Sequence, residues 1–205
     1  SFPCVVKSAN QGSSIGISVL ANADFENFCK AINKSFFTYY LVAEEWNNKS
    51  FDEKVEFVRT LTDIREGIGI PVKISSKIIF HPEELLSNLN QLFSEPEEGI
   101  LIESIDGESE ILIEEFIEGK EFSCIVIENS NGCPVALPPT EIRKGKELFD
   151  YRSKYLPGLS RKITPIHLPT EEIHKIRKAC ENLFSRLSFN VYARIDGFIK
   201  ADGTI

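Results

Sequence analysis

The sequence predicts an α+β fold in which helices pack on mainly antiparallel sheets. Short strand-like runs are joined by turn signals, most clearly between residues 2–7 and 15–20. Helical segments with one apolar side are interspersed with these runs. The 205 residues suffice for one medium domain or two small ones, since a chain of this length can bury well over half of its unfolded surface.

The first predicted elements are a hairpin and a helix. Residues 2–7 form a short strand, and a polar, glycine-rich turn at residues 8–16 leads into a second strand. Asn22 or Asp24 can cap the helix that follows, and we expect this helix to end in the aromatic cluster at residues 36–40.

Two further helices have clear start signals. Ser50 and Glu53 form a capping box, and the helix that they open is expected to stop at Gly67. Pro82, at a first-turn position, starts a short helix that runs through Leu92. Strands are predicted at residues 100–105, 111–117 and 121–127.

The last part of the chain combines an irregular segment with a strongly patterned one. Residues 143–162 are polar and without period, and loops of this length are usually functional or disordered. An amphipathic helix is predicted at residues 170–187, and a strand at residues 190–200 precedes an Asp202-Gly203 turn signal. No internal repeat is visible in the sequence.

Composition argues against several classes of protein. The 31 acidic and 23 basic residues give a net charge of −8, so no non-specific binding to nucleic acid or anionic lipid is expected. The longest apolar runs are strand-sized, so no membrane span is expected. Five cysteines without a C-x-x-C spacing argue against a disulfide framework or a structural zinc and favour a reducing cytoplasm. The lack of methionine and of a signal peptide predicts an excised piece of a longer protein.

The glycine-rich turn is a candidate phosphate site. Gly12 and Gly16 let the backbone approach a ligand, and the hydroxyls of Ser13 and Ser14 with nearby N–H groups can hold phosphate oxygens. A flexible hairpin loop explains these residues about equally well. Lys7 favours the phosphate site, because it ends the preceding strand and places a cation beside the turn.

An acidic segment, residues 114–121, follows an apolar strand. A solvated strand end is the usual fate of such a run. Here, however, the strand brings carboxylates and free backbone groups to one place, as recognition of an adenine edge and a ribose diol would require.

Arg194 and Asp196 are two residues apart on a predicted strand, which points both side chains to one face. A buried ion pair is one explanation. The other is a guanidinium that faces a transferring phosphoryl group beside a carboxylate that binds magnesium. Residues 149–155 interleave aromatic with cationic side chains and are, taken alone, compatible with a surface loop.

Four stretches, taken in order, resemble the ATP-grasp superfamily and, within it, the D-alanine-D-alanine ligase group. They are residues 2–7 with the turn at 12–18, the acidic strand at 112–121, the segment at 149–155 and the strand at 192–196. Each stretch alone is a weak signal, whereas the ordered set is specific.

The resemblance implies how ATP would be held. Lys7 would bind its phosphates, and Ser13 and Ser14 would lie in the loop that closes over them. The adenine would face Glu114 and the backbone around Glu115, Phe116 and Ile117, and the ribose would be held by Glu121.

The resemblance also implies the groups that act on the transferred phosphoryl. Lys154 and Tyr155 would close the site from the segment at residues 149–155. Arg194 would stabilise the phosphoryl group, and Asp196 would bind Mg²⁺.

The implied activity is that of an ATP-dependent carboxylate–amine ligase with small-molecule amino acid substrates, which forms an amide through an acyl phosphate in cell wall biogenesis. Residues 1–117 would form the smaller ATP-grasp subdomain, with an insertion at about residues 33–109, and residues 118–205 the start of the larger one. The N-terminal domain and the C-terminal metal-binding end would be absent, so we expect the isolated chain to be inactive. A homodimer is compatible with this assignment. A non-catalytic nucleotide-binding module and an interaction domain are the alternatives.

Overall fold

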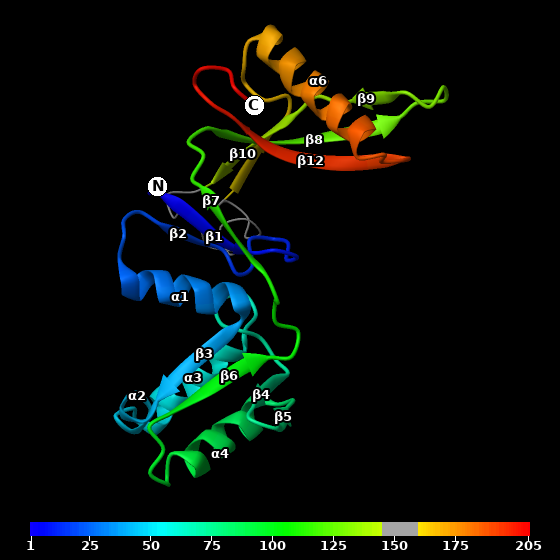
Figure 1. The fold of residues 1–205 in the computed structure, drawn as a ribbon. Helices are drawn as coiled ribbons and strands as arrows, with labels where there is room; N and C mark the ends of the chain where they lie inside the picture. The colour runs from blue at the N-terminus through cyan, green and yellow to red at the C-terminus, as the bar shows by residue number, and fades with distance from the viewer. Residues whose placement is uncertain (145–159) are drawn as a thin grey trace. The chain divides into compact units, whose positions relative to one another are not determined.

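The computed structural model describes residues 1–144 and 160–205. The described chain forms two compact units (Figure 1). The boundary falls between Phe116 and Ile117. Within these described ranges, no helix combines the length and the apolar character needed to cross a lipid bilayer. Lys154 and Tyr155 lie outside the described residues.

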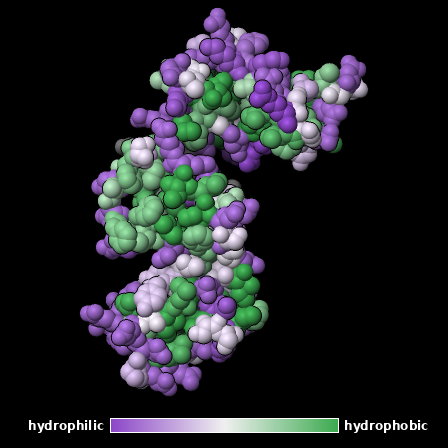
Figure 2. All heavy atoms as spheres, viewed as in Figure 1, coloured by the Kyte–Doolittle hydropathy of each residue, from purple (hydrophilic) through white to green (hydrophobic). Residues whose placement is uncertain are grey.

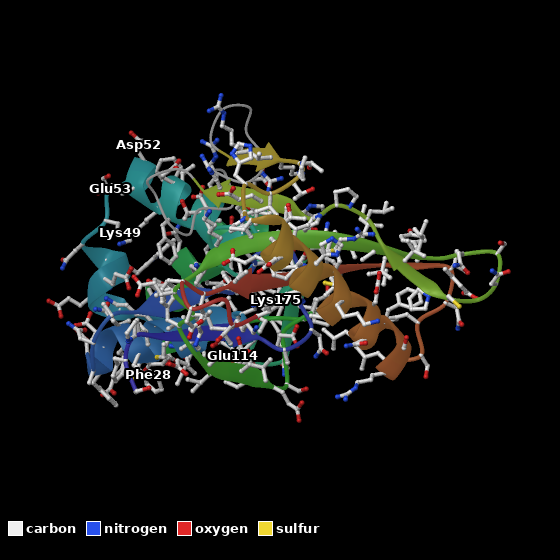
Figure 3. The ribbon with its side chains drawn as sticks, turned by 90° about the horizontal axis from the view of Figure 1, so that it is seen from above. Phe28, Lys49, Asp52, Glu53, Glu114 and Lys175 are labelled. Atoms are coloured by element: carbon white, nitrogen blue, oxygen red, sulfur yellow. The ribbon has the colours of Figure 1, made fainter. Side chains whose placement is uncertain are left out.

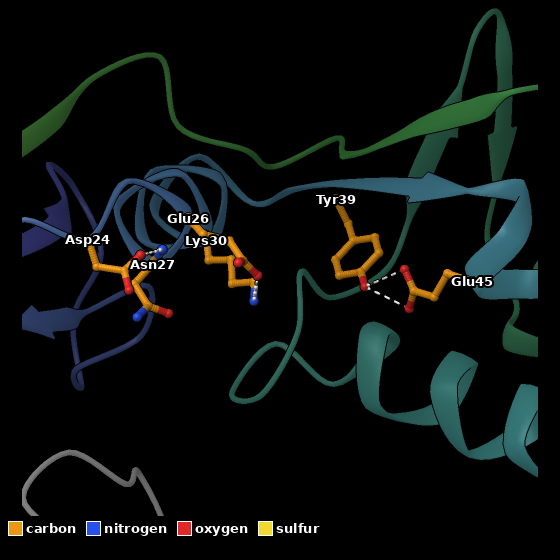
Figure 4. A network of polar contacts seen from close by, with 6 residues as sticks. All are labelled: Asp24, Glu26, Asn27, Lys30, Tyr39 and Glu45. Carbon is orange, nitrogen blue, oxygen red and sulfur yellow. Dashed lines mark hydrogen bonds and ion pairs between the residues drawn. The ribbon is translucent and has the colours of Figure 1, made fainter.

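The first unit contains a three-stranded antiparallel sheet with the strand order β2-β1-β7 (Figure 1). Its strands are β1 (Cys4–Ser8), β2 (Ser18–Leu20) and β7 (Ile111–Glu115). Helix α1 (Phe25–Phe36) covers one face, where the buried side chains of Cys4, Val6, Leu20 and Ala31 form a small core. The predicted hairpin and helix are therefore confirmed. Asp24 is the cap, because its Oδ1 accepts a hydrogen bond from the Asn27 amide at 3.0 Å (Figure 4).

A second, four-stranded antiparallel sheet in the same unit has the order β3-β6-β4-β5. Its strands are β3 (Thr38–Val42), β4 (Val72–Ile74), β5 (Lys77–Ile79) and β6 (Gly99–Ser104). The helices associated with it are α2 (Ala43–Asn47), α3 (Phe51–Thr62) and α4 (Pro82–Leu92). Side chains of all three helices, such as Trp46, Leu61 and Leu89, pack with Val72 and Ile102 in the largest core that the described residues form.

The start of α3 was predicted correctly and its end was not. Ser50 and Glu53 form the expected capping box at the N-terminal end of the helix. Figure 3 labels Glu53 there. The helix ends at Thr62, five residues before Gly67. Gly67 instead lies on the returning chain, where an added Cβ would be only 2.3 Å from the carbonyl oxygen of Leu61. This glycine permits a close approach to the helix end rather than terminating the helix.

The described residues of the second unit form a sheet with a long helix on one face. Its strands are β8 (Lys120–Glu128), β9 (Pro134–Ala136), β10 (Thr140–Lys144), β11 (Ser160–Ile163) and β12 (Tyr192–Ile199), and the helix is α6 (Thr170–Arg186). The order is β11-β10-β8-β12, and β9 pairs with β8. The core contains Phe122, Cys124 and Val126 of β8 with Ile176, Cys180 and Phe184 of α6.

The polar segment at residues 143–162 is not a loop throughout. Its two ends belong to β10 and β11, which pair antiparallel with Arg143 opposite Arg161. Long cationic side chains at successive positions hide the period of two by which a strand is usually found.

Candidate functional site

Lys7 and Glu114 meet on one face of the first sheet, although the whole second sheet separates them along the chain. Strand β1 pairs with β7 so that Val5 is opposite Glu114 and Lys7 is opposite Leu112. Paired residues of an antiparallel ladder point to the same side, so Lys7 and Glu114 are diagonal neighbours. Their Nζ and Oε2 atoms are 2.7 Å apart. Figure 3 labels the Glu114 side chain on β7.

We call the face that carries Val5, Lys7, Val19, Leu112 and Glu114 the outer face of the first sheet. It lies opposite the face that is covered by α1, because Cys4 and Val6 alternate with Val5 and Lys7 along β1. Leu112 is 43% exposed, and hydrophobic residues of the unit reach the surface in Figure 2. The outer face therefore combines apolar surface with one cation and one carboxylate.

The Lys7–Glu114 pair is open to solvent. The lysine side chain is 31% exposed and the glutamate side chain 48% exposed. Ion pairs of this exposure contribute little to stability. Exchange of the glutamate for a more highly charged phosphate would therefore cost little free energy.

The loop at residues 9–17 is fixed at its C-terminal end. Gly16 has φ +70°, and an added Cβ would be 2.2 Å from Ser8 Oγ, so glycine is required here. The Ser8 hydroxyl donates to the Ser35 carbonyl at 2.8 Å, and the Ser35 hydroxyl donates to the Gly16 carbonyl at 2.8 Å. These bonds attach the loop to α1 and to the end of β1, immediately after Lys7.

The tip of the same loop is more open. Ser13 and Ser14 both have φ near +60°, which turns the chain sharply. An added Cβ on Gly12 would meet nothing within 4 Å. Of the two serines predicted for phosphate binding, Ser13 is exposed and Ser14 is half-buried, and a rigid anchor follows them.

The end of β7 differs in part from the expectation. Glu115 is opposite Cys4 and exposed. The amide of Phe116 donates to the Pro3 carbonyl at 3.2 Å and is therefore not available to an adenine edge. Ile117, which is 41% exposed, is the first residue of the second unit.

In the second unit, Arg194 and Asp196 lie on the sheet face opposite to α6. Arg194 is opposite Ile125 and Asp196 is opposite Ser123, whereas the buried residues of β8 alternate with these two. Arg194 Nη2 donates to Asp196 Oδ2 at 3.1 Å. Their side chains are 68% and 51% exposed, so the buried ion pair considered from the sequence is wrong.

Glu121 shares this face, because it alternates with Phe122 along β8. Gly197 of β12 leaves room for the ring of Phe122, its partner on β8. An added Cβ would be 2.8 Å from Cζ of Phe122. Among the described residues, no group of three histidine, cysteine or acidic side chains is arranged to hold a metal ion. Asp196 can supply one carboxylate to Mg²⁺, which commonly takes one or two carboxylates and completes its shell with phosphates and water.

One buried acid of the second unit was missed in the sequence. Glu141 is 5% exposed and accepts a hydrogen bond at 2.7 Å from Arg143 Nε. This hydrogen bond holds the pKa of Glu141 below its ordinary value. Glu141 lies just before the stretch without period and Arg143 begins it, so no sequence signal distinguished them.

Comparison with known proteins relates the chain to one family. Residues 94–205 match the family model described as D-ala D-ala ligase C-terminus. The D-alanine--D-alanine ligase of Fervidobacterium nodosum is 33% identical over 146 residues, which cover 67% of this chain and 42% of that protein. The D-alanine--D-alanine ligase of Carboxydothermus hydrogenoformans is 32% identical over 151 residues, covering 73% and 46%. The chain thus spans less than half the length of these curated relatives.

A solved structure shares the fold. The VanG D-Ala:D-Ser ligase from Enterococcus faecalis aligns with 100% of this chain and 38% of its own, with a TM-score of 0.51 and 16% identity. At this identity the likeness concerns the fold alone. It agrees with the ATP-grasp architecture expected from the four sequence stretches.

Proposed function

Because the chain belongs to the D-ala D-ala ligase C-terminus family, we propose that it is the nucleotide-binding part of an ATP-dependent carboxylate–amine ligase. The γ-phosphoryl group of ATP would pass to a substrate carboxylate, giving an acyl phosphate and ADP. An amine would then attack the acyl carbon, expel phosphate, lose a proton and leave an amide. Two molecules of D-alanine are the substrates that the relatives' names suggest, and the product would serve cell wall biogenesis.

The outer face of the first sheet is the observation that carries this proposal. Lys7 would release Glu114 and bind a phosphate of ATP in its place. Ser13 and Ser14 would contact the phosphates from the neighbouring turn. Glu114 would then be free to accept a hydrogen bond from the adenine amino group. Exposed Leu112 offers apolar surface of the kind on which a base ring packs.

The second unit supplies the charges that phosphoryl transfer requires. Arg194 would stabilise negative charge on the transferred group, and Asp196 would be one ligand of Mg²⁺. The metal would neutralise charge on the phosphates. Such chemistry asks for positioning and for cations rather than for a protein nucleophile.

Further assignments belong to the same proposal. Glu121 would hold the ribose, and Lys154 with Tyr155 would close the site. The units at residues 1–116 and 117–205 would be the smaller and larger ATP-grasp subdomains. We also propose a cytoplasmic location and a protein that acts as a homodimer, with no membrane or nucleic acid partner.

Transfer of oxygen-18 tests the reaction class. The natural protein that contains this chain would receive ATP, Mg²⁺ and D-alanine labelled with oxygen-18 in its carboxylate. An acyl phosphate places one labelled oxygen in the released phosphate for each amide formed. Asp196→Asn should lower the rate at least tenfold without changing the labelling. Unlabelled phosphate, or release of AMP in place of ADP, would refute the proposal.

A further inference from the structure

The two sheets of the first unit are built from the same succession of elements. Around the first sheet, the chain forms β1, β2, α1 and finally β7. Around the second sheet, it forms β4, β5, α4 and β6 in this order (Figure 1). In each sheet the first strand pairs antiparallel with its hairpin partner on one side and with the closing strand on the other.

The register of the strands is the same in both sheets. In the first sheet, Cys4 lies between Leu20 and Glu115. In the second sheet, Val72 lies between Ile79 and Ser104. Two positions further along the first strand, the equivalent triplets are Ser18-Val6-Ile113 and Lys77-Ile74-Ile102.

Burial and sequence follow the same correspondence. Cys4, Val6 and Leu20 are buried beneath α1, and the equivalent Val72, Ile74 and Ile79 are buried in the core that contains Leu85 and Leu89 of α4. A proline, Pro3 or Pro71, directly precedes the first strand. The closing strands share the sequence Ile-Leu-Ile-Glu, at residues 100–103 and 111–114.

We propose that residues 71–104 repeat the ββαβ motif of the first sheet, and that this repeat has lost the nucleotide site. The loss of the nucleotide site rests on the proposed function of the outer face. The repeat lies within the segment that we expected from the sequence to be an insertion, at about residues 33–109. It escaped detection in the sequence because only four consecutive residues match, and these belong to strands that each close a different sheet.

The groups assigned to ATP are missing from the repeat. Ser75 stands at the position of Lys7, and the loop at residues 9–17 is replaced by a turn of two residues, Ser75 and Ser76. The carboxylate is retained, because Glu103 is equivalent to Glu114. Lys73, opposite Glu103, lies where the first sheet has Val5.

The inserted segment begins and ends at neighbouring points. The Ser104 amide donates to the Phe37 carbonyl at 2.9 Å, so the chain enters β3 and leaves β6 at one place. An added Cβ on Gly107 would be 3.0 Å from the Phe36 carbonyl oxygen. The glycine therefore permits the outgoing chain to lie close to the end of α1. After the second sheet has formed, the chain therefore returns to the first sheet, and β7 completes it.

A titration with Mg-ATP compares two lysines that occupy the same face of their motifs. We expect Lys7→Ala to weaken binding by the 205-residue chain at least tenfold, and Lys73→Ala to change the Kd less than twofold. Equal weakening by both variants would overturn the proposal, because the repeat would then contribute to the site. If Lys7→Ala binds like the wild type, or the wild type does not bind, the proposed function fails and with it the loss of a site in the repeat.

Amide hydrogen exchange tests the repeat without reference to ATP. Val6→Ala and Ile74→Ala truncate buried side chains at equivalent positions of the two cores. We expect Val6→Ala to accelerate exchange at least tenfold in β1 and β7 and less than twofold in β4 and β6, and Ile74→Ala to do the converse. Equal acceleration in both sheets by either variant would show one cooperative structure and contradict an independent repeat.

Discussion

Gly12 and Gly16 belong to the same loop, but only one of them is required by its surroundings. Gly16 combines a positive φ with a close approach to Ser8 Oγ, whereas an added Cβ on Gly12 meets open space. Gly16→Ala should therefore lower the free energy of unfolding by about 1–3 kcal/mol, the range expected for strained backbone. Gly12→Ala should change it by less than about 0.5 kcal/mol, as at other open surface positions. Urea unfolding of both variants decides; equal losses would mean that the loop is not anchored as described.

Tyr39 links β3 to α2 through Glu45. Its hydroxyl donates to Oε1 and Oε2 of Glu45 at 3.1 and 3.3 Å (Figure 4). Burial, and then the adjacent carboxylate, raise the pKa of Tyr39 from 10.0 to about 12. The folded state thus retains the phenolic proton more strongly than the unfolded chain does.

The stabilisation from Tyr39 should accordingly be complete below pH 10 and disappear as the pH rises through 12. Because the pair is partly exposed, solvent screening limits the effect to on the order of 1 kcal/mol. The measurement is the difference in unfolding free energy between wild type and Tyr39→Phe from pH 8 to 12. A difference that does not change over this range would show that the hydroxyl has no coupling to Glu45.

At the level of elements, helix α6 holds the edge strand β9 by two side chains. Glu181 Oε1 accepts from the Ala136 amide at 3.1 Å, and Arg177 Nε donates to the Ala136 carbonyl at 2.8 Å. Both backbone groups of this residue are thereby satisfied on the side away from β8. The pairing of β9 in the second unit thus depends on α6 as well as on β8.

Glu181→Ala should destabilise the chain by about 1–3 kcal/mol, because the partly buried Ala136 amide loses its acceptor. Lys178→Ala is the matched control. The Lys178 side chain is 73% exposed, and its Nζ forms only a long ion pair, of 3.9 Å, with Glu181 Oε2. Thermal unfolding of the two variants gives the comparison. Similar melting temperatures for both would indicate that the bond to Ala136 contributes nothing.

The helices with a start signal and the strands β1, β6, β7, β8 and β12, each of five residues or more, were predicted from the sequence. The capping box at Ser50 and the first-turn Pro82 gave the starts of α3 and α4 correctly. Strands β4 and β5 have three residues each, which is too short for an alternation to be recognised. Strand β3 was taken for the end of a helix, because its aromatic residues directly follow α1.

The residues of the candidate site could be proposed from the sequence, but their positions relative to one another could not. Lys7 and the glycine-rich turn are local in sequence, so their proximity follows from one hairpin. The contact between Lys7 and Glu114 depends on the register between β1 and β7, which no local pattern determines. The engaged amide of Phe116 depends on the same pairing.

At the scale of the whole molecule, the chain is a member of a ligase family with an additional folded segment. The family match begins at residue 94, which takes in β6, β7 and the entire second unit. The motif with Lys7 lies before that match and is joined to it by the pairing of β1 with β7. The proposed nucleotide binding therefore depends on the outer face of the first sheet.

Backbone amide chemical shifts during a titration with Mg-ATP test that surface most directly. We predict saturable changes for Lys7, Ser13 and Glu114 and for their neighbours in β1 and β7. Changes in the amides of β4 and β5 should be much smaller, since their face lacks the loop and the equivalent lysine. No saturable change at millimolar ATP, or changes confined to residues outside the outer face and its loop, would contradict the account.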